Sequence, residues 1–328
     1  MHEPAVLMLI AFFLDLLIGD PPYRLHPIRL LGRWIEIIEK GLRRSSLEGR
    51  TGGILLVLLA SGVFIGAFLL LSSAAAHIHP WVALLFHLYV AYSGLALGDL
   101  LHHIRPVIHG LEAGDLAAAR LALGRVVGRD VACLNHEAVV RASVETLAEN
   151  FVDGFLSPLF WYALGGIAAL GLGLPPTQTA LGALLLFKTA STLDSMVGYR
   201  NDRYERFGWA GARMDDGMNF LPARLSVPIL FLGACLSGLP PWRGLRSALR
   251  DRLQHDSPNA GHPESFAAGA LGIRLGGPTQ YNGELTNKPW LGEAHDGADI
   301  RHISFATTLI KRSAWIAMAL LLSPFLFQ

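Results

Sequence analysis

The chain has 328 residues, of which 52% are hydrophobic and only 16% are charged, whereas about 25% of residues are charged in an ordinary soluble domain. The net charge of +1 gives no basis for nucleic-acid binding, and two cysteines are too few for a disulfide framework. The apolar residues come in blocks rather than in a periodic stripe. We therefore expect an all-α polytopic integral membrane protein, a helical bundle of about four to seven membrane segments with cytoplasmic helical loops.

Crossing the hydrocarbon core of a bilayer takes about 20 mostly apolar residues. The sequence offers seven candidate segments, some of them short or interrupted by a charge, and we expect 221–239 to be re-entrant if any segment is, because it contains Pro222 and Pro228. In chain order the candidates are residues 5–18, 54–72, 81–97, 155–174, 179–193, 221–239 and 313–327. The hydrophilic segments between them are residues 19–53, 98–154, 194–220 and 240–312.

Lysine and arginine set the expected topology, because loops rich in these residues stay in the cytoplasm. Residues 19–53 carry seven of them, so this loop is predicted to be cytoplasmic, and 98–154 and 194–220 return to the same side. Residues 240–312 carry nine, yet a full span at 221–239 would place them outside. A re-entrant 221–239 would keep them in the cytoplasm, and the sequence leaves both arrangements open.

The stretch "SVETLAENFVDGFLSPLFW" (143–161) places Glu145, Glu149 and Asp153 four residues apart. On a helix this spacing puts the three carboxylates on one face, where they repel one another unless a cation lies among them. Magnesium is suited to such oxygen ligands, together with substrate phosphates and water. The alternative is a solvated helix face in which Glu145 pairs with Arg141.

A second polar stretch, from Lys188 to Arg224, has the composition of a magnesium–phosphate site. Asp215 and Asp216 are adjacent, with an asparagine three residues beyond, and Lys188 and Asp194 interrupt or abut apolar sequence. In such sites the metal bridges phosphate oxygens while lysine and arginine neutralise the remaining charge. Surface pairing of Arg and Asp side chains is the alternative. It accounts poorly for charges beside apolar residues.

A third stretch, "HDSPNAGHPESFAAGALGIRLGG" (255–277), begins with a turn and leads into an expected helix. Ser257, Pro258, Asn259 and Gly261 are predicted to form a turn with free N–H groups, which can hold an anion. An ordinary loop is the alternative. The chain has no GKS or GKT sequence and no HExxH pair, so neither a Walker A loop nor a zinc site is supported.

Together with "GDPPYRLHPIRLLGRWIE" (19–36), these stretches resemble, in order and over nearly the whole chain, the CobD/CbiB family of cobalamin biosynthesis. The resemblance implies an integral membrane adenosylcobinamide-phosphate synthase. Such an enzyme uses ATP to join adenosylcobyric acid to (R)-1-amino-2-propanol or its O-phosphate. Glu264 and Phe266 depart from the family pattern, which puts a role for Glu264 in doubt. Since no DxHxxG motif is present, no histidine is expected on the cobalt.

For such a ligase we expect an acyl phosphate intermediate, which requires ATP and Mg²⁺, with the corrinoid as substrate and not as cofactor. The residues that we assign to this chemistry are Glu149, Asp153, Asp202 and Asp215 as metal ligands; Asp194, Asp216, His255 and Asp256 as catalytic groups; and Lys188, Arg200, Arg224, Ser257, Asn259 and Gly261 as phosphate or ATP ligands. Asp194 and Asp216 would also belong to the metal-binding carboxylates, and His255 or Asp256 would accept a proton from the amine.

The expected location is the inner membrane of a bacterial or archaeal cell, with the active site on the cytoplasmic side. Other membrane enzymes that assemble the nucleotide loop are expected partners. Three other readings stay open at this point: a transporter of corrinoids or cations, which would also carry intramembrane charges, a magnesium-dependent prenyltransferase, and a non-catalytic scaffold.

Overall fold

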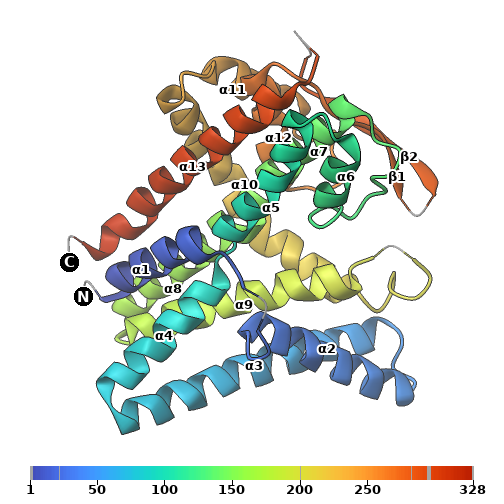
Figure 1. Ribbon diagram of the computed structural model, residues 1–328. Helices are drawn as coiled ribbons and strands as arrows, with labels where there is room; N and C mark the ends of the chain where they lie inside the picture. The colour runs from blue at the N-terminus through green and yellow to red at the C-terminus, as the bar shows by residue number, and fades with distance from the viewer. Residues whose placement is uncertain (1–2, 22, 200, 282, 294–296, 327–328) are drawn as a thin grey trace. The chain divides into compact units, whose positions relative to one another are not determined.

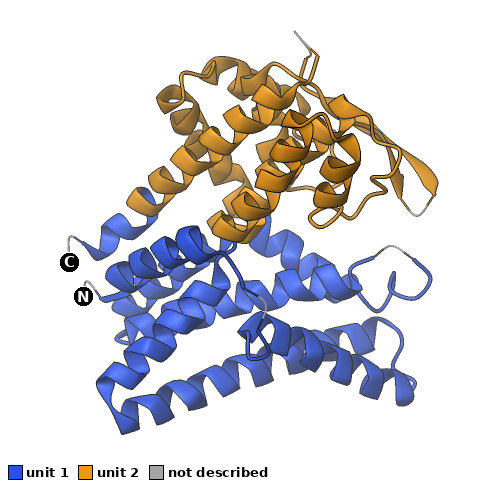
Figure 2. Ribbon diagram, in the orientation of Figure 1, with its two compact units in different colours: residues 1–96, 157–219, 320–328 blue, residues 97–156, 220–319 orange. Residues whose placement is uncertain are grey.

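The computed structural model describes residues 3–21, 23–199, 201–281, 283–293 and 297–326. The chain is mostly helical, which confirms the predicted fold class. It forms two compact units, drawn in different colours in Figure 2. Unit 1 comprises residues 1–96, 157–219 and 320–328, and unit 2 comprises residues 97–156 and 220–319.

Unit 1 is a bundle of helices, most of them apolar (Figure 1). Within it α8 packs closely on α9, and α3 packs on both α4 and α9. Its helices are α1 (Glu3–Ile18), α2 (Pro27–Arg44), α3 (Arg50–Ile78), α4 (Pro80–Gly94), α8 (Ser157–Leu172), α9 (Pro176–Val197), the first part of α10 (Trp209–Leu236) and the short 3₁₀ helix η2 (Ser323–Phe325).

Unit 2 combines shorter helices with a two-stranded antiparallel sheet. The hairpin was not predicted, although the Asn-Gly pair at residues 282–283 is a sequence signal for one. The elements are α5 (Leu97–Glu112), α6 (Leu116–Leu123), α7 (His136–Phe151), the π-helical turn η1 (Val152–Leu156), the second part of α10, α11 (Pro241–Asp251), α12 (Gly261–Leu271), β1 (Leu275–Tyr281), β2 (Glu284–Leu291) and most of α13 (Ile300–Leu322).

Five helical stretches of the described residues are long and apolar enough to cross a membrane. A sixth is possible if α4 and α5 act together as one broken span. The five are Arg50–Ile78, His136–Leu172, Pro176–Val197, Trp209–Leu236 and Ile300–Phe325. This number agrees with a multi-pass membrane protein, and α1, with 16 residues, is too short to pass the same length test.

Two segments differ from the expected boundaries. The stretch predicted to start at Phe155 belongs to a continuous helical run that starts at His136, because η1 joins α7 directly to α8. Prolines were expected to break residues 221–239, whereas α10 continues through both Pro222 and Pro228. Whether α10 spans the membrane fully or re-enters it stays a prediction.

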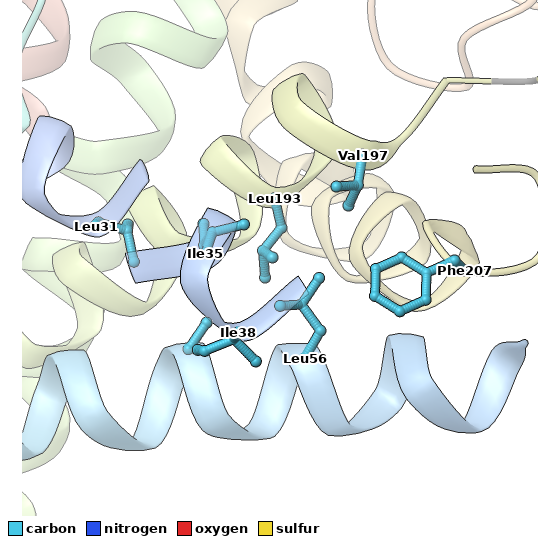
Figure 3. Close-up of a cluster of buried hydrophobic side chains, with 8 residues drawn as sticks. Leu31, Ile35, Ile38, Leu56, Leu193, Val197 and Phe207 are labelled. Carbon is cyan, nitrogen blue, oxygen red and sulfur yellow. The ribbon is translucent and has the colours of Figure 1, made fainter. Parts of the chain in front are cut away.

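A buried apolar cluster fixes the C-terminal end of α9 in unit 1. Leu31, Ile35 and Ile38 lie on one face of α2, at helical spacing, and meet Leu193 of α9 and Phe207 (Figure 3). The other members are Leu56 and Ala60 of α3 and Val197 of α9. The backbone at the start of α3 lies close to the backbone at Phe207: a Cβ atom at Gly53 would lie 2.0 Å from the carbonyl oxygen of Phe207. This packing positions the last turn of α9, which carries Asp194.

Candidate functional site

A group of half-buried charged residues lies where α9 and α10 approach each other in unit 1. Asp215 interacts electrostatically with Asp194, Asp216 and Lys188, so four residues predicted from sequence come together in the structure. The helices come close because Gly211 of α10 has no side chain: a Cβ atom there would lie 3.1 Å from the Cβ atom of Leu193. We call these four residues the α9–α10 acidic cluster.

Neutral side chains hold Asp215 of this cluster in place. The Nδ2 atom of Asn219 donates to both carboxylate oxygens of Asp215, at 3.1 and 3.2 Å. The hydroxyl of Ser157 in turn donates to Oδ1 of Asn219 at 2.5 Å, and this orients the amide. The side chain of Asp194 packs closely against Gly198 instead. A Cβ atom at Gly198 would lie 2.1 Å from Oδ1 of Asp194. The carboxylate of Asp215 is therefore oriented by a neutral amide.

Two other predicted residues follow α9. Asp202 is exposed in the turns that connect α9 to α10, and Arg200 lies outside the described residues. Among the described residues, no three His, Cys, Asp or Glu side chains form a group that could hold a metal ion. A magnesium ion at the acidic cluster would therefore have at most two ligands from these side chains and would take the others from phosphates and water, which is its preferred mode.

Unit 2 contains a polar cavity of about 160 Å³. Its walls come from the loop before α7, α7 itself, the turn before α12, α12 and the β-hairpin. The ionisable residues that line it are Arg129, Glu145, Glu149, His255, Glu264, Tyr281 and Lys288. We call this the unit 2 cavity. Its volume suits a small molecule.

The predicted row of three carboxylates is only partly correct. Glu145 and Glu149 both line the cavity, but Asp153 falls in η1, where the wider π turn interrupts the four-residue repeat. Glu145 does not pair with Arg141 as the alternative reading required. It forms an ion pair with Arg129 instead, while Arg141 pairs with Glu137 at 3.2 Å. Glu145 is thus a structural group, and Glu149, which is exposed, is the one that faces solvent.

Glu264 is buried in the wall of the unit 2 cavity. Burial raises its pKa well above the usual value, and the nearby carboxylates of Glu149 and Glu145 raise it further. Lys288 also faces this site, and its Nζ atom donates to the hydroxyl of Tyr281 at 2.6 Å. Besides the Glu145–Arg129 ion pair, the cavity is lined by the carboxyl groups of Glu149 and Glu264 and by one lysine. Carboxyl groups in a small polar cavity can bind a small cation.

His255 is fixed by the turn that follows it. Its Nδ1 atom accepts the backbone N–H of Ser257 at 2.9 Å, so the neutral ring carries its proton on Nε2, which lies 3.8 Å from Oε2 of Glu264. Burial lowers the pKa of His255, and the charge of Lys288 lowers it further. Asp256 beside it is exposed. The Nδ1 atom of His255 is thus occupied, and the role of this residue as a proton acceptor stays a prediction.

Three N–H groups of the turn at 257–261, which was predicted to hold an anion, are paired within the turn. Besides the N–H of Ser257, those of Asn259 and Ala260 donate to the hydroxyl of Ser257, at 3.3 and 3.2 Å. The turn is rigid because these groups are paired internally. Glycine is required at position 261 because the backbone of Arg252 lies close to it. A Cβ atom at Gly261 would lie 2.3 Å from the carbonyl oxygen of Arg252.

Positive charge nevertheless gathers beside this turn. Nη1 of Arg224 approaches Oδ1 of Asn259 at 3.5 Å, which brings two of the predicted phosphate ligands together. The guanidinium also stacks over the ring of Phe220. Burial lowers the pKa of His262 to about 4, and Arg224 and Arg252 contribute to the shift. Any anion held here would be bound by arginine side chains rather than by backbone amides.

Sequence reasoning missed several residues of the unit 2 cavity. Arg129 and Lys288 lie far apart in polar stretches without a motif, so nothing local marks them. Glu264 had a signal, because a single carboxylate opens the apolar run "SFAAGALG", although its role was doubted. A charged residue in an otherwise apolar, buried helix requires a partner or a function.

Comparisons with known proteins agree with these features. Residues 8–310 match the protein family described as CobD/Cbib protein. The chain belongs to the CobD/CbiB family. It is 43% identical to the cobalamin biosynthesis protein CobD of Pelobacter propionicus, an alignment that covers 98% of this chain and 96% of the relative. It is 39% identical to the cobalamin biosynthesis protein CbiB of Salmonella typhimurium, over 96% of this chain and 95% of the relative. No solved structure matches the chain.

Proposed function

We propose that this protein is an ATP-dependent amide ligase of cobalamin biosynthesis, which joins adenosylcobyric acid to 1-amino-2-propanol or its O-phosphate. The observation that carries the pathway assignment is the match along almost the whole chain to relatives named as cobalamin biosynthesis proteins. Two separate polar centres, one in each unit, support a reaction that must handle both phosphates and an amine.

A carboxylate and an amine do not condense spontaneously in water, so the reaction needs an activated acid. In the proposed reaction a propionate oxygen attacks the terminal phosphorus of ATP, which gives an acyl phosphate and ADP. The ammonium group first gives up one proton, and the free amine then attacks the carbonyl carbon. A C–N bond forms, the C–O bond to phosphate breaks, and a second proton leaves the nitrogen with the departing phosphate. The protein therefore has to neutralise phosphoryl charge and accept a proton.

The α9–α10 acidic cluster is the proposed phosphate centre. Asp215, oriented by Asn219, and Asp216 fit a magnesium ion that retains phosphate and water ligands. The metal, when bound, supplies positive charge to phosphate oxygens. Lys188 would neutralise the remaining phosphoryl charge, and Asp194 would hold a water molecule bound to the metal. The roles of Asp153, Asp202 and Arg200 in metal or phosphate binding stay predictions.

The unit 2 cavity is the proposed site for the amine. An amino alcohol arrives as an ammonium ion, and the carboxyl groups of Glu149 and Glu264 would bind it. Glu264 is suited to accept the proton, because its raised pKa makes it a stronger base than an ordinary glutamate. The cations Lys288 and Arg129 would meet a phosphate group if the substrate is the phosphate ester. Arg224 and Asn259 stay candidates for the phosphates of ATP.

We place these residues on the cytoplasmic side of the inner membrane, where ATP is available. The lysines and arginines of residues 19–53 support this orientation.

The test is a turnover assay on washed membranes that contain the protein, supplied with adenosylcobyric acid, ATP, magnesium and either aminopropanol or its phosphate. The expected result is an ATP-dependent product whose mass is acid plus amine minus water, and this also identifies the amine. Absence of product with both amines, with intact protein in the membrane, would overturn the proposal and favour a transporter or a scaffold. Uptake of labelled corrinoid would then distinguish these two.

A further inference from the structure

Helix α11 presents an exposed face that the proposed reaction does not use. Trp242 is 68% exposed, Leu249 is 62% exposed and Leu253, just beyond the helix, is 74% exposed. These positions are separated by seven and four residues, so they form one stripe along the helix and its extension. An apolar stripe of this kind on the outside of a protein marks an interaction surface.

The opposite face of α11 is fixed by close packing on α12 within unit 2. A Cβ atom at Gly244 would lie 2.8 Å from the ring of Phe266. One at Gly269 would lie 2.5 Å from the carbonyl oxygen of Arg243. Because the two helices touch through glycines, α11 cannot rotate to bury its apolar stripe. The stripe is therefore permanently directed outward.

The position of α11 in the chain places it beside a candidate membrane span. Helix α10 ends at Leu236, and α11 begins at Pro241. The ring of Trp242 packs edge-on against that of Phe231, 4.9 Å between centroids. Phe231 lies five residues, about 7.5 Å, before the end of α10. Trp242 thus lies beside the end of a candidate span, and tryptophan is enriched where spans leave the hydrocarbon.

Two arginines accompany the apolar stripe: Arg246 lies on the same face, between Trp242 and Leu249, and Arg243 lies beside it. Arg243 and Arg246 are exposed on α11, and within the described part of the chain neither has an ion pair. Arg250 differs, because it is bound to both Asp251 and Glu293. Two cations beside an apolar stripe are typical of helices that lie in a membrane interface and bind anionic lipid.

We propose that α11 is an interfacial membrane helix, with its Trp242–Leu249–Leu253 stripe among the lipid chains and with Arg243 and Arg246 bound to phosphate groups of anionic lipids. Continuity with α10 favours lipid over a protein partner, because the apolar residues Leu232 and Leu236 at the end of α10 are also exposed. The helix would thereby fix the depth of unit 2, including its cavity, relative to the bilayer surface. This inference does not depend on the proposed reaction.

The test uses the full chain in lipid nanodiscs, with Cys133 and Cys235 replaced by serine and a single spin label at Leu249→Cys. Collision rates with oxygen, which concentrates in lipid, and with a water-soluble nickel chelate are compared with two reference sites. Leu70→Cys, on the exposed face of α3, is the lipid reference, and Glu48→Cys is the aqueous reference. The label at 249 should behave as the one at 70.

A nickel-accessible label at 249, as at 48, would overturn the proposal. A label that neither reagent reaches would also overturn it, because protein would then cover the stripe. Leu253→Cys provides a second labelled position if the first variant does not fold.

Arg243→Gln with Arg246→Gln tests the lipid headgroup. Wild-type protein should hold the label deeper in nanodiscs of phosphatidylglycerol than in those of phosphatidylcholine, and the double variant should lose this difference. The matched control is Arg125→Gln, another exposed arginine of unit 2, which should retain it. Equal label depth in both lipids for the wild type would show that the arginines do not bind anionic lipid.

Discussion

Oε1 of Glu145 accepts the backbone N–H of Gly276 at 2.6 Å, across 131 residues of sequence. The other carboxylate oxygen accepts the guanidinium of Arg129, so one buried side chain of α7 holds both the β-hairpin and the loop before α7. Gly276 is needed at this point, because its φ is 78° and a Cβ atom would lie 2.4 Å from the carbonyl oxygen of Pro289. Glu145 therefore organises the walls of the unit 2 cavity.

Substitution of Glu145 by glutamine should destabilise the protein by about 3–5 kcal/mol, because it leaves the part-buried guanidinium of Arg129 without its partner. Thermal unfolding in detergent would measure the effect. The matched control is Glu137→Gln, which breaks the exposed pair with Arg141 and should cost about 0–1 kcal/mol. Equal losses in the two variants would show that Glu145 is not an anchor.

Much of the fold follows from the sequence because apolar length is a local property. Every predicted membrane segment lies largely within a helix of the structure, and α3 and α9 extend only a few residues beyond the predicted limits. The candidate span His136–Leu172 starts earlier than hydropathy predicts. All residues from Ala142 to Ala148 are buried, so this polar part of α7 is stabilised by tertiary packing, which hydropathy does not record.

The two polar centres differ in how far the sequence predicts them. The α9–α10 acidic cluster joins residues that are close in sequence or abut apolar helices, so Lys188, Asp194, Asp215 and Asp216 were all identified. The unit 2 cavity brings together loops that lie more than 100 residues apart, and Arg129 and Lys288 have no local motif. Such pairing depends on the fold of the whole unit.

The acidic cluster is tested by Asp194→Asn and Asp216→Asn. Each keeps the shape of the side chain but removes its charge, so turnover should fall by about 100-fold or more, while the amount of protein in the membrane stays unchanged. The assay is the ATP-dependent formation of the amide product. Glu36→Gln, an exposed carboxylate on α2 in the same unit, should retain full activity. Full activity in the two aspartate variants would exclude the cluster as the phosphate centre.

His262 should make the protein sensitive to acid. Its pKa is lowered from 6.5 to about 4 by burial and by Arg224 and Arg252, so the unfolded chain takes up a proton before the folded chain does. The stability that this residue provides is complete above pH 6.5 and is lost as the pH falls toward 4. Between these values, His262→Gln should lose less stability than the wild type, as measured by unfolding at a series of pH values.

His136→Gln is the control for this titration, since His136 is exposed at the start of α7. It should reproduce the wild-type dependence on pH. A His262→Gln variant with the wild-type slope would assign the acid sensitivity to other groups.

Substitution of Glu149 distinguishes two roles of its carboxylate, as a ligand of the amine or as a ligand of the metal. If it binds the ammonium group of the amine, Glu149→Gln should raise the KM for the amine and leave the KM for ATP unchanged. Loss of one charge-assisted hydrogen bond costs about 1.5–3 kcal/mol, which corresponds to a rise of roughly 10- to 100-fold. Glu264→Gln should raise the same KM and also lower kcat, because it removes the proposed proton acceptor. If Glu149→Gln instead raises the KM for ATP or magnesium alone, Glu149 is a metal ligand, as its sequence spacing first suggested.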